Sequence, residues 1–230
     1  MTPLVYGFSK FVCWLFFRIG YGLKVTGREH VPRHGPCIIA SNHISFLDPV
    51  VIGAACPRRL TFMARNTLFR HPLLRAWLIG VGAMPLNRDE ADPSAVRGAL
   101  QCLRRGQPIA LFPEGTRQES GRLGTAKRGV GLLAVMGRVP VVPAYVHGTF
   151  EALPRDATRL YPSKILVAFG PVIAYTSKSV PPASPSEGPP EGAQAGERAL
   201  RADQERIAHA VTAAWQQLEA GMHGRTPPAS

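Results

Sequence analysis

A histidine and an aspartate stand five positions apart, directly after a short apolar run. Residues 36–41 (PCIIAS) predict a buried strand, and the segment that follows starts at Asn42, contains His43 and reaches Asp48. A histidine held against a carboxylate can take up and release protons near neutral pH. On a regular helix, side chains five apart point about 140° away from each other, so His43 and Asp48 meet only if the loop curls. The alternative is that Asp48 and Ser45 cap the next helix and His43 is an ordinary loop residue.

A second polar segment also follows an uncharged, strand-like run. Residues 108–112 (PIALF) lead into residues 112–117 (FPEGTR). Gly115 lets a backbone N–H approach a ligand closely, and Arg117 can hold a phosphate in a bidentate fork. Taken alone, the segment is equally well interpreted as a polar turn with an ion pair between Glu114 and Arg117. Loops at the carboxyl ends of strands are, however, where open α/β sheets bind ligands.

Strand-like and helix-like segments alternate between residues 23 and 179, which we interpret as one domain. Strands are predicted at 23–31 (with a turn), 36–41, 59–64, 82–86, 108–112, 139–146 and 164–169. Helices are predicted at 49–56, 68–79, 92–106 and 129–136. Asp48 is expected to be the N-cap of the first of these helices, with Pro49 at its first position. Uncharged strands alternating with helices favour an α/β fold, with a largely parallel sheet flanked by helices.

The two ends of the chain carry further predicted helices. Residues 180–196 are rich in proline, glycine and serine without periodicity, which predicts a flexible linker. Residues 197–220 follow with apolar positions at helical spacing, from Leu200 to Leu218. This C-terminal amphipathic helix could pack on its own domain, on a partner or on a membrane, and the sequence leaves the choice open.

Residues 1–22 contain a dense apolar run, 4–17 (LVYGFSKFVCWLFF), which is interrupted by Lys10 and closed by Arg18. The run is shorter than the roughly 20 apolar residues of a bilayer-spanning helix, and it has no cleavage-site pattern of a signal peptide. Its apolar residues recur at helical spacing. We therefore predict a helix that lies in the membrane interface, with Lys10 and Arg18 reaching the headgroups. An ordinary core helix is the alternative.

Composition narrows the class of protein. The chain has 230 residues, 45% of them hydrophobic and 18% charged, which is typical of a folded domain. Its formal net charge of +12 suits an anionic partner, such as nucleic acid, anionic lipid or a phosphorylated substrate. Four scattered cysteines without ligand-like spacing predict reduced thiols in a cytosol-facing protein, without disulfides or a metal site.

Taken together, the two polar segments and two further motifs resemble the glycerolipid acyltransferase family, most closely its lysophosphatidic acid acyltransferases. The resemblance covers roughly residues 20–175. The four family blocks are matched in order by Asn42-His43 through Asp48, by 82–88 (GAMPLNR), by 112–117 (FPEGTR) and by 139–143 (VPVVP). Lys127 and Gly129 match a lysine and a glycine that commonly follow the third block.

The resemblance implies an O-acyl transfer without a covalent intermediate. His43 would remove the proton of the acceptor hydroxyl, and Asp48 would orient the imidazole ring and stabilise its charged form. The hydroxyl itself would attack an acyl thioester, either acyl-CoA or acyl-carrier protein. Backbone N–H groups near Gly115 would stabilise the oxyanion. No cofactor is expected, because the acyl thioester is a co-substrate. No metal is expected, because the seven histidines form no HExxH or paired-ligand spacing.

The resemblance also implies the substrate-binding residues. They are Arg65, Arg88, Glu114, Gly115, Thr116 and Arg117. The arginines would bind the acceptor phosphate, and Glu114 would orient the acceptor or its arginine partners. Arg65 stands where family members often carry a lysine, so the charge is kept but the hydrogen-bonding geometry differs.

Other classes of function are less well supported by the sequence. A serine hydrolase would need a Gly-x-Ser-x-Gly elbow, which the chain lacks. Residues 129–134 (GVGLLA) match a dinucleotide fingerprint but follow basic loop residues instead of a strand. Nucleic-acid binding is disfavoured because the basic residues are dispersed. The main alternative is a non-catalytic phospholipid-binding protein. We expect a membrane-associated, peripheral or monotopic protein that faces the cytoplasm and acts on a lysophospholipid.

Overall fold

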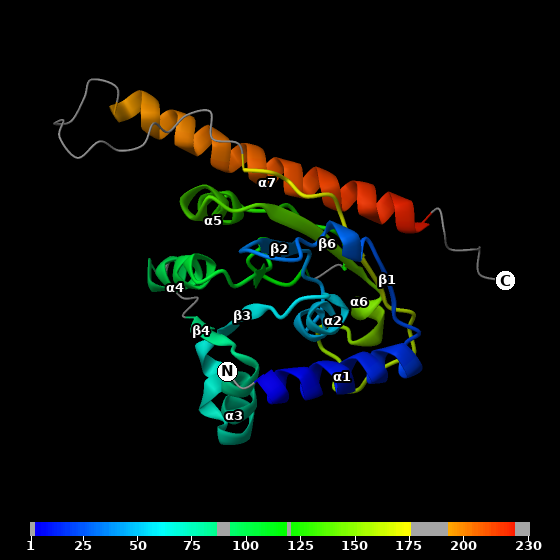
Figure 1. Ribbon diagram of the computed structural model, residues 1–230. Coiled ribbons are helices and arrows are strands. Elements are labelled where there is room, and N and C mark those ends of the chain that lie inside the picture. The colour runs from blue at the N-terminus through cyan, green and yellow to red at the C-terminus, as the bar shows by residue number, and fades with distance from the viewer. Residues whose placement is uncertain (1–2, 87–92, 119–120, 176–192, 224–230) are drawn as a thin grey trace.

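A seven-stranded sheet forms the centre of the molecule, with strand order β1-β7-β6-β2-β5-β3-β4 (Figure 1). The computed structural model describes residues 3–86, 93–118, 121–175 and 193–223. The strands are β1 (Lys24–Thr26), β2 (Ile38–Ser41), β3 (Thr61–Arg65), β4 (Met84–Leu86), β5 (Ile109–Leu111), β6 (Val141–His147) and β7 (Leu166–Phe169). The helices are α1 (Pro3–Gly20), α2 (Asp48–Ala55), α3 (Pro72–Val81), α4 (Pro93–Arg104), α5 (Gly129–Gly137), α6 (Thr149–Ala152) and α7 (Ala193–His223), with short 3₁₀ turns η1 (Arg28–His30) and η2 (Asn66–Arg70).

Strands β6, β2, β5, β3 and β4 all run in one direction. Strand β7 is antiparallel to β6, and β1 is parallel to β7, so the last two strands run the other way. The α/β fold class with a largely parallel sheet is therefore confirmed. Every strand predicted from the sequence has its counterpart here, whereas the one-turn helix α6 carries too short a pattern to be predicted.

Consecutive residues of the central strands serve two separate cores, because side chains alternate across a sheet. Ile39 of β2 packs against α1 and α2 residues such as Phe17 and Ile52. Its neighbour Ile38 packs on the opposite side with residues of α4, α5 and α7, including Trp215. We call the first side of the sheet the α2 face and the second the α7 face. Both are buried, which is why the strands carry so few charges.

Helix α7 covers the α7 face by lying along α5 and β6 (Figure 1). Three side chains of α7 are fully buried in the core of this face: Ile207, Val211 and Trp215. The indole N–H of Trp215 donates to the carbonyl oxygen of Ala40 in β2, at 2.9 Å. Of the three surroundings that the sequence left open for this helix, the described residues therefore place it on its own domain. Most of the predicted linker 180–196 lies outside the described residues.

Helix α1 lies across the α2 face and leaves one side of itself uncovered. Tyr6 and Phe17 are buried against the domain, whereas Leu4, Phe8 and Ile19 are 85%, 72% and 76% exposed. Among the helices in the described parts of the chain, none has the length and apolarity needed to cross a membrane.

The prediction that Lys10 reaches outward to lipid headgroups is wrong. Its amino group donates a hydrogen bond to the carbonyl oxygen of Cys56, just beyond the end of α2. Burial lowers the pKa of this lysine below its ordinary value. Lys10 interrupts the apolar run in the sequence, as noted above. Its side chain lies on the side of α1 that faces the domain, and its hydrogen bond joins α1 to the end of α2.

Candidate active site

The two polar segments meet because β2 and β5 are neighbours in the sheet. Ile39 pairs with Ala110 and Ala40 with Leu111, so the loops that follow both strands leave the same edge side by side. The chain then passes from β2 to α2 on one face and from β5 to α5 on the other. A parallel sheet opens a crevice at such a point, where successive connections depart to opposite faces. His43 and Glu114, 71 positions apart in the sequence, are thereby brought into one site.

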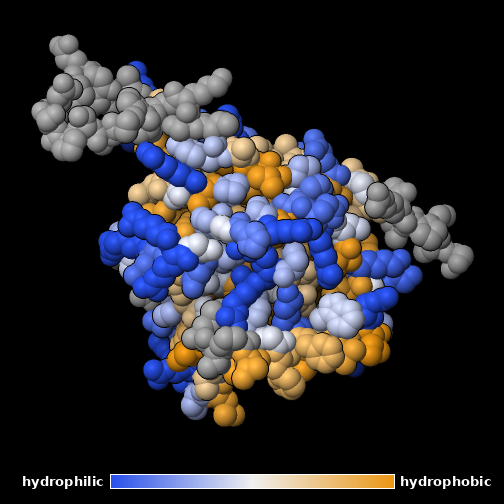
Figure 2. All heavy atoms as spheres, viewed as in Figure 1, coloured by the Kyte–Doolittle hydropathy of each residue, from blue (hydrophilic) through white to orange (hydrophobic). Residues whose placement is uncertain are grey.

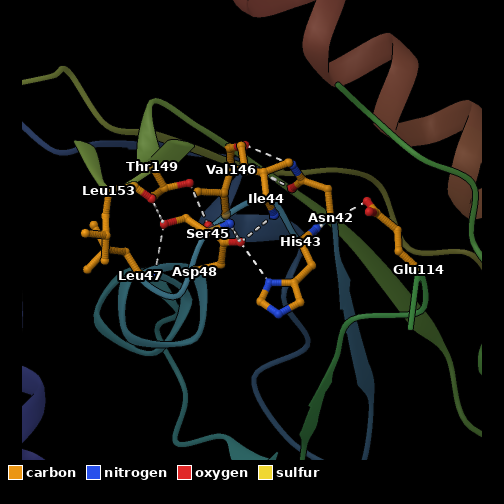
Figure 3. A network of polar contacts seen from close by, with 10 residues as sticks. All are labelled: Asn42, His43, Ile44, Ser45, Leu47, Asp48, Glu114, Val146, Thr149 and Leu153. Atoms are coloured by element: carbon orange, nitrogen blue, oxygen red, sulfur yellow. Dashed lines mark hydrogen bonds and ion pairs between the residues drawn. The ribbon is translucent and has the colours of Figure 1, made fainter. Parts of the chain in front are cut away.

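The carboxylate of Asp48 organises the loop that follows β2 (Figure 3). Its Oδ2 accepts hydrogen bonds from the backbone N–H groups of Ile44 and Ser45, at 2.7 and 2.8 Å, and lies 2.9 Å from Nδ1 of His43. Its Oδ1 accepts a hydrogen bond of 2.6 Å from the hydroxyl of Thr149. Asp48 is fully buried, so these donors replace the water that its charge has lost.

The predicted N-cap role of Asp48 is wrong. Asp48 is the first residue of α2, and Leu47 holds the N-cap position without a side-chain capping bond. The carboxylate turns back toward residues 43–45 instead of forward along the helix. This backward turn is the curl that the spacing of His43 and Asp48 requires, and it brings the two side chains together.

The ring of His43 contacts Asp48 and Phe112, and its backbone makes two hydrogen bonds. Its side chain is 8% exposed, and its ring centroid lies 4.4 Å from that of Phe112. A carboxylate accepts from Nδ1 only when that nitrogen carries the proton, so Nε2 is the unprotonated nitrogen of the neutral ring. The backbone N–H of His43 donates to Glu114 at 3.2 Å, and its carbonyl oxygen accepts from the N–H of Gln118 at 3.0 Å.

Glu114 is buried beside His43, and its carboxylate accepts the hydrogen bond from the His43 backbone N–H. Burial raises the pKa of the Glu114 carboxyl, while hydrogen bonds from the Gln118 side chain and from the backbone of His43 and Gly124 oppose the shift. The family resemblance implies that this residue orients the acceptor or its arginine partners. Its observed contacts position the loop after β2, which carries His43.

The turn at Gly115 depends on glycine. The φ angle of Gly115 is +82°, a left-handed conformation that other residues adopt with strain, and a Cβ built there would lie 2.9 Å from Nζ of Lys127. The N–H of Gly115 donates to the carbonyl oxygen of Phe112 at 3.0 Å. That N–H is therefore used inside the turn, and the expectation that backbone N–H groups near Gly115 stabilise an oxyanion stays a prediction for its neighbours. Thr116 follows it and lines the cavity described below.

The arginines predicted to bind phosphate have different outcomes. The guanidinium of Arg117 lies over the exposed ring of Phe46, 3.5 Å from the ring centroid. Arg65 ends β3, which pairs with β5, so its backbone lies at the same edge of the sheet as the loops after β2 and β5. Arg88 lies outside the described residues.

A cavity of about 570 Å³ extends from the ring of His43 between α1, α2, α3 and β3. Most of its lining is apolar, including Val50 and Ala54 of α2, Phe62 of β3 and Leu78 of α3. Polar side chains line it near His43, among them Thr116 and Arg117. The arrangement places a proton acceptor where an apolar chain and a charged group can meet.

Three residues of the site carried no signal strong enough to single them out. Thr149 completes the hydrogen bonds of Asp48 and follows the end of β6. Gln118 holds the carbonyl oxygen of His43, and Arg155 lines the cavity from the loop after α6. All three reach the site through strand order, which local patterns do not encode. Among the described residues, no group of three or more His, Cys, Asp or Glu side chains could hold a metal ion.

Comparison with known proteins decides the family. Residues 22–147, more than half of the chain, match the model of the family described as Acyltransferase. The chain belongs to the acyltransferase family. The resemblance drawn from the four sequence blocks is therefore confirmed.

Relatives within this family carry one recurring name. The chain is 30% identical over 128 residues to a 1-acyl-sn-glycerol-3-phosphate acyltransferase of Bacillus subtilis, covering 55% of this chain and 63% of the relative. It is also 30% identical to the human 1-acyl-sn-glycerol-3-phosphate acyltransferase beta, covering 72% of this chain and 62% of the relative. The chain thus spans less than two thirds of the length of these family members.

The fold agrees with a solved structure from the same group of proteins. The crystal structure of the 1-acyl-sn-glycerophosphate acyltransferase of Thermotoga maritima superposes with a TM-score of 0.64 and covers 89% of this chain and 78% of that one. Sequence identity to it is 23%, so the likeness concerns the fold.

Proposed function

We propose that this protein transfers a fatty acyl chain from an acyl-CoA or acyl-carrier-protein thioester to the free hydroxyl of lysophosphatidate or a related lysophospholipid. The observation that carries the proposal is the buried pair of His43 and Asp48 at the head of a largely apolar cavity. The pair supplies a proton acceptor, and the cavity has room for a hydrocarbon chain. The names of the relatives support the same reaction.

The geometry is consistent with general-base catalysis by His43. Nε2 would accept the proton of the acceptor hydroxyl while its oxygen attacks the thioester carbonyl carbon. Asp48 would stabilise the imidazolium that forms, through its 2.9 Å contact with Nδ1. Collapse of the tetrahedral intermediate would break the carbon–sulfur bond, and the departing thiolate would take the proton back from Nε2. The new ester and a free thiol are the products, so the enzyme ends as it began.

Substrate placement follows from the lining of the cavity. The hydrocarbon chain would lie among the apolar side chains of α2, α3 and β3, because their burial by the chain removes apolar surface from water. Arg117 would bind the acceptor phosphate close to His43, since both residues line the same cavity. Arg65 and Arg88 remain candidates for the same phosphate on the strength of the family resemblance.

The exposed side of α1 supports a membrane-surface location. Figure 2 shows apolar side chains gathered along the lower edge of the molecule, over the position of α1. Leu73 and Ile79 of α3 add 77% and 52% exposed side chains to the same region, and Trp77 of α3 donates to the hydroxyl of Ser9 in α1 at 3.2 Å. We propose that this surface, α1 with α3, rests in the membrane interface on the cytoplasmic side and presents the cavity to lipid.

A turnover assay tests the proposal. Purified protein is mixed with lysophosphatidate and either acyl-CoA or acyl-carrier protein, and thiol release and lipid product are followed. His43→Ala should lower kcat by a factor of about 10² to 10⁴, because a general base is lost. Retained circular dichroism and vesicle binding in that variant show that the fold survives. Unchanged turnover would contradict the mechanism, and no turnover by the wild type with either donor would favour a lipid-binding protein.

A further inference from the structure

Helix α6 and the residue that follows it are joined by two hydrogen bonds to the first residue of α2 and to the loop after β2. The hydroxyl of Thr149 donates to Oδ1 of Asp48 at 2.6 Å, and the hydroxyl of Ser45 donates to the carbonyl oxygen of Leu153 at 2.9 Å (Figure 3). Thr149, Ser45 and Asp48 are fully buried. Moving α6 or Leu153 would break bonds of buried groups, so the start of the loop after α6 is held in place relative to His43.

Arg155 is carried by this loop, two residues after Leu153. It lines the same cavity as His43 and Arg117, and it is exposed to solvent. Phe46, which also lines the cavity, is 60% exposed, so the cavity opens to solvent on this side. Two arginines from different loops therefore line this one cavity: Arg117 from the loop after β5 and Arg155 from the loop after α6.

We propose that Arg155 is a second phosphate-binding residue of this site, acting together with Arg117. The inference rests on the proposed acyl transfer. A phosphate monoester carries close to two negative charges near neutral pH, so one arginine leaves part of its charge unbalanced. Two planar guanidinium groups can each offer paired donors to its oxygens. Because Arg155 is exposed, its charge has lost little hydration and needs no buried partner to stay ionised.

The phosphate has two possible sources that share this chemistry. One is the phosphate of the lysolipid acceptor, whose hydroxyl must reach His43. The other is a phosphate of coenzyme A in the donor. A donor without phosphate separates them, since an acyl N-acetylcysteamine thioester carries the reacting carbonyl alone.

The test compares Arg155→Ala and Arg155→Lys with Arg159→Ala as the matched control. Arg159 is in the same loop, but its guanidinium lies 5.0 Å from the ring centroid of Tyr161, and its Nε donates to the Tyr161 hydroxyl. It does not belong to the cavity lining. KM and kcat are measured for lysophosphatidate, for acyl-CoA and for the phosphate-free thioester.

Arg155→Ala should raise the KM for one phosphate-bearing substrate about tenfold with little change in kcat, the effect of losing one charge-assisted hydrogen bond. Arg155→Lys should restore part of this loss, because it keeps the charge without the planar fork. A raised KM for lysophosphatidate with either donor assigns the phosphate to the acceptor. A raised KM for acyl-CoA alone assigns it to the donor. Unchanged KM for both, or an equal change in Arg159→Ala, overturns the proposal.

Equilibrium binding separates this proposal from the proposed reaction. In the His43→Ala background, calorimetry with lysophosphatidate and with coenzyme A reports phosphate binding without turnover. Adding Arg155→Ala should weaken one of these affinities about tenfold, whereas adding Arg159→Ala should not. Equal affinities with and without Arg155 would refute its role even if the wild-type enzyme is active. A loss of affinity would support its role even if no donor gives turnover.

Discussion

The two faces of the sheet are covered in different ways. On the α7 face, a helix of 31 residues lies along α5 and β6, and its inward side chains, with Trp215 among them, are fully buried. On the α2 face, α1 and α3 leave a cavity of about 570 Å³ beneath them and expose large apolar side chains above it. Leu47 of the loop after β2 and Ala152 of α6 pack in the core of this second face.

Because of this difference, one face of the sheet stabilises the fold and the other is available to bind lipid. Apolar area that is buried inside the protein stabilises the fold, whereas apolar area that is left exposed remains available to a chain or a bilayer. We therefore expect substitutions on the α7 face to act on unfolding and those on the α2 face to act on binding and turnover. Three predictions test this division, from the largest expected effect to the smallest, and a fourth tests how a buried charge beside the site affects stability.

Trp215→Ala should lower the free energy of unfolding by about 3–5 kcal/mol, because it leaves a cavity where a large, fully buried side chain was packed. It also removes the donor that the carbonyl oxygen of Ala40 accepts from. Urea denaturation followed by circular dichroism measures the change. Phe8→Ala on α1 is the control and should shift the free energy by no more than about 0.5 kcal/mol, since that side chain is exposed. Equal losses in the two variants would contradict the division.

Replacing Leu4 and Phe8 together by serine should weaken binding to anionic vesicles by about tenfold or more. Each side chain contributes roughly 1.5–3 kcal/mol when its apolar surface is fully removed from water, and partial insertion yields a fraction of that. Vesicle co-sedimentation measures the affinity. Met136→Ser provides the matched control, because Met136 is 52% exposed on α5, over the other face, and its replacement should leave vesicle binding unchanged.

Thr149→Val should lower kcat about tenfold, while Thr149→Ser should keep most of it. The valine has nearly the same shape but leaves Oδ1 of the buried Asp48 without its 2.6 Å donor, a loss of about 1–3 kcal/mol. Single-turnover kinetics together with a melting curve separate a catalytic effect from a general loss of stability. If serine fails to restore kcat, the hydroxyl is not what positions the carboxylate.

The smallest expected effect is the contribution of Glu114 to the change of the free energy of unfolding with pH. Burial raises its pKa in the folded state, so in acid the unfolded chain loses this proton first as the pH rises. Between the ordinary value of 4.5 and the raised value, the folded state holds more protons, and the wild type should lose stability as the pH increases. Above both values the loss stays constant. Glu114→Gln, which still accepts from the N–H of His43, should flatten this slope, and identical slopes in both proteins would exclude Glu114 as its source.

The site was partly predictable from residues that lie close together in the chain. His43, Asp48 and the segment 112–117 stand in local patterns, so their types and spacing were sufficient to propose them. Asp48 shows the limit of that approach. Its position before Pro49 is typical of an N-cap, but its carboxylate binds residues 43–45 and Thr149, because burial makes every available donor valuable there.

Lys10 and Arg155 show the same limit at the surface. Both are cations, and the local sequence around each predicts a side chain that points to solvent or to lipid headgroups. Lys10 instead donates to the carbonyl oxygen of Cys56, and Arg155 lines the same cavity as Arg117. Each outcome depends on an element distant in the sequence: the end of α2 for Lys10, and for Arg155 the loop after β2, which binds Leu153.

The sequence by itself determined the alternation of elements, the α/β class, the family blocks and the amphipathic character of the terminal helices. These properties follow from side-chain periodicity and from residue types within a few positions of one another. Only the tertiary structure decided that β2 lies beside β5, that α7 packs over α5 and β6 while α1 leaves a cavity, and that Thr149 and Arg155 join the site. The physical reason is that strand order and helix placement minimise the free energy of the whole domain, to which residues far apart in the chain contribute together.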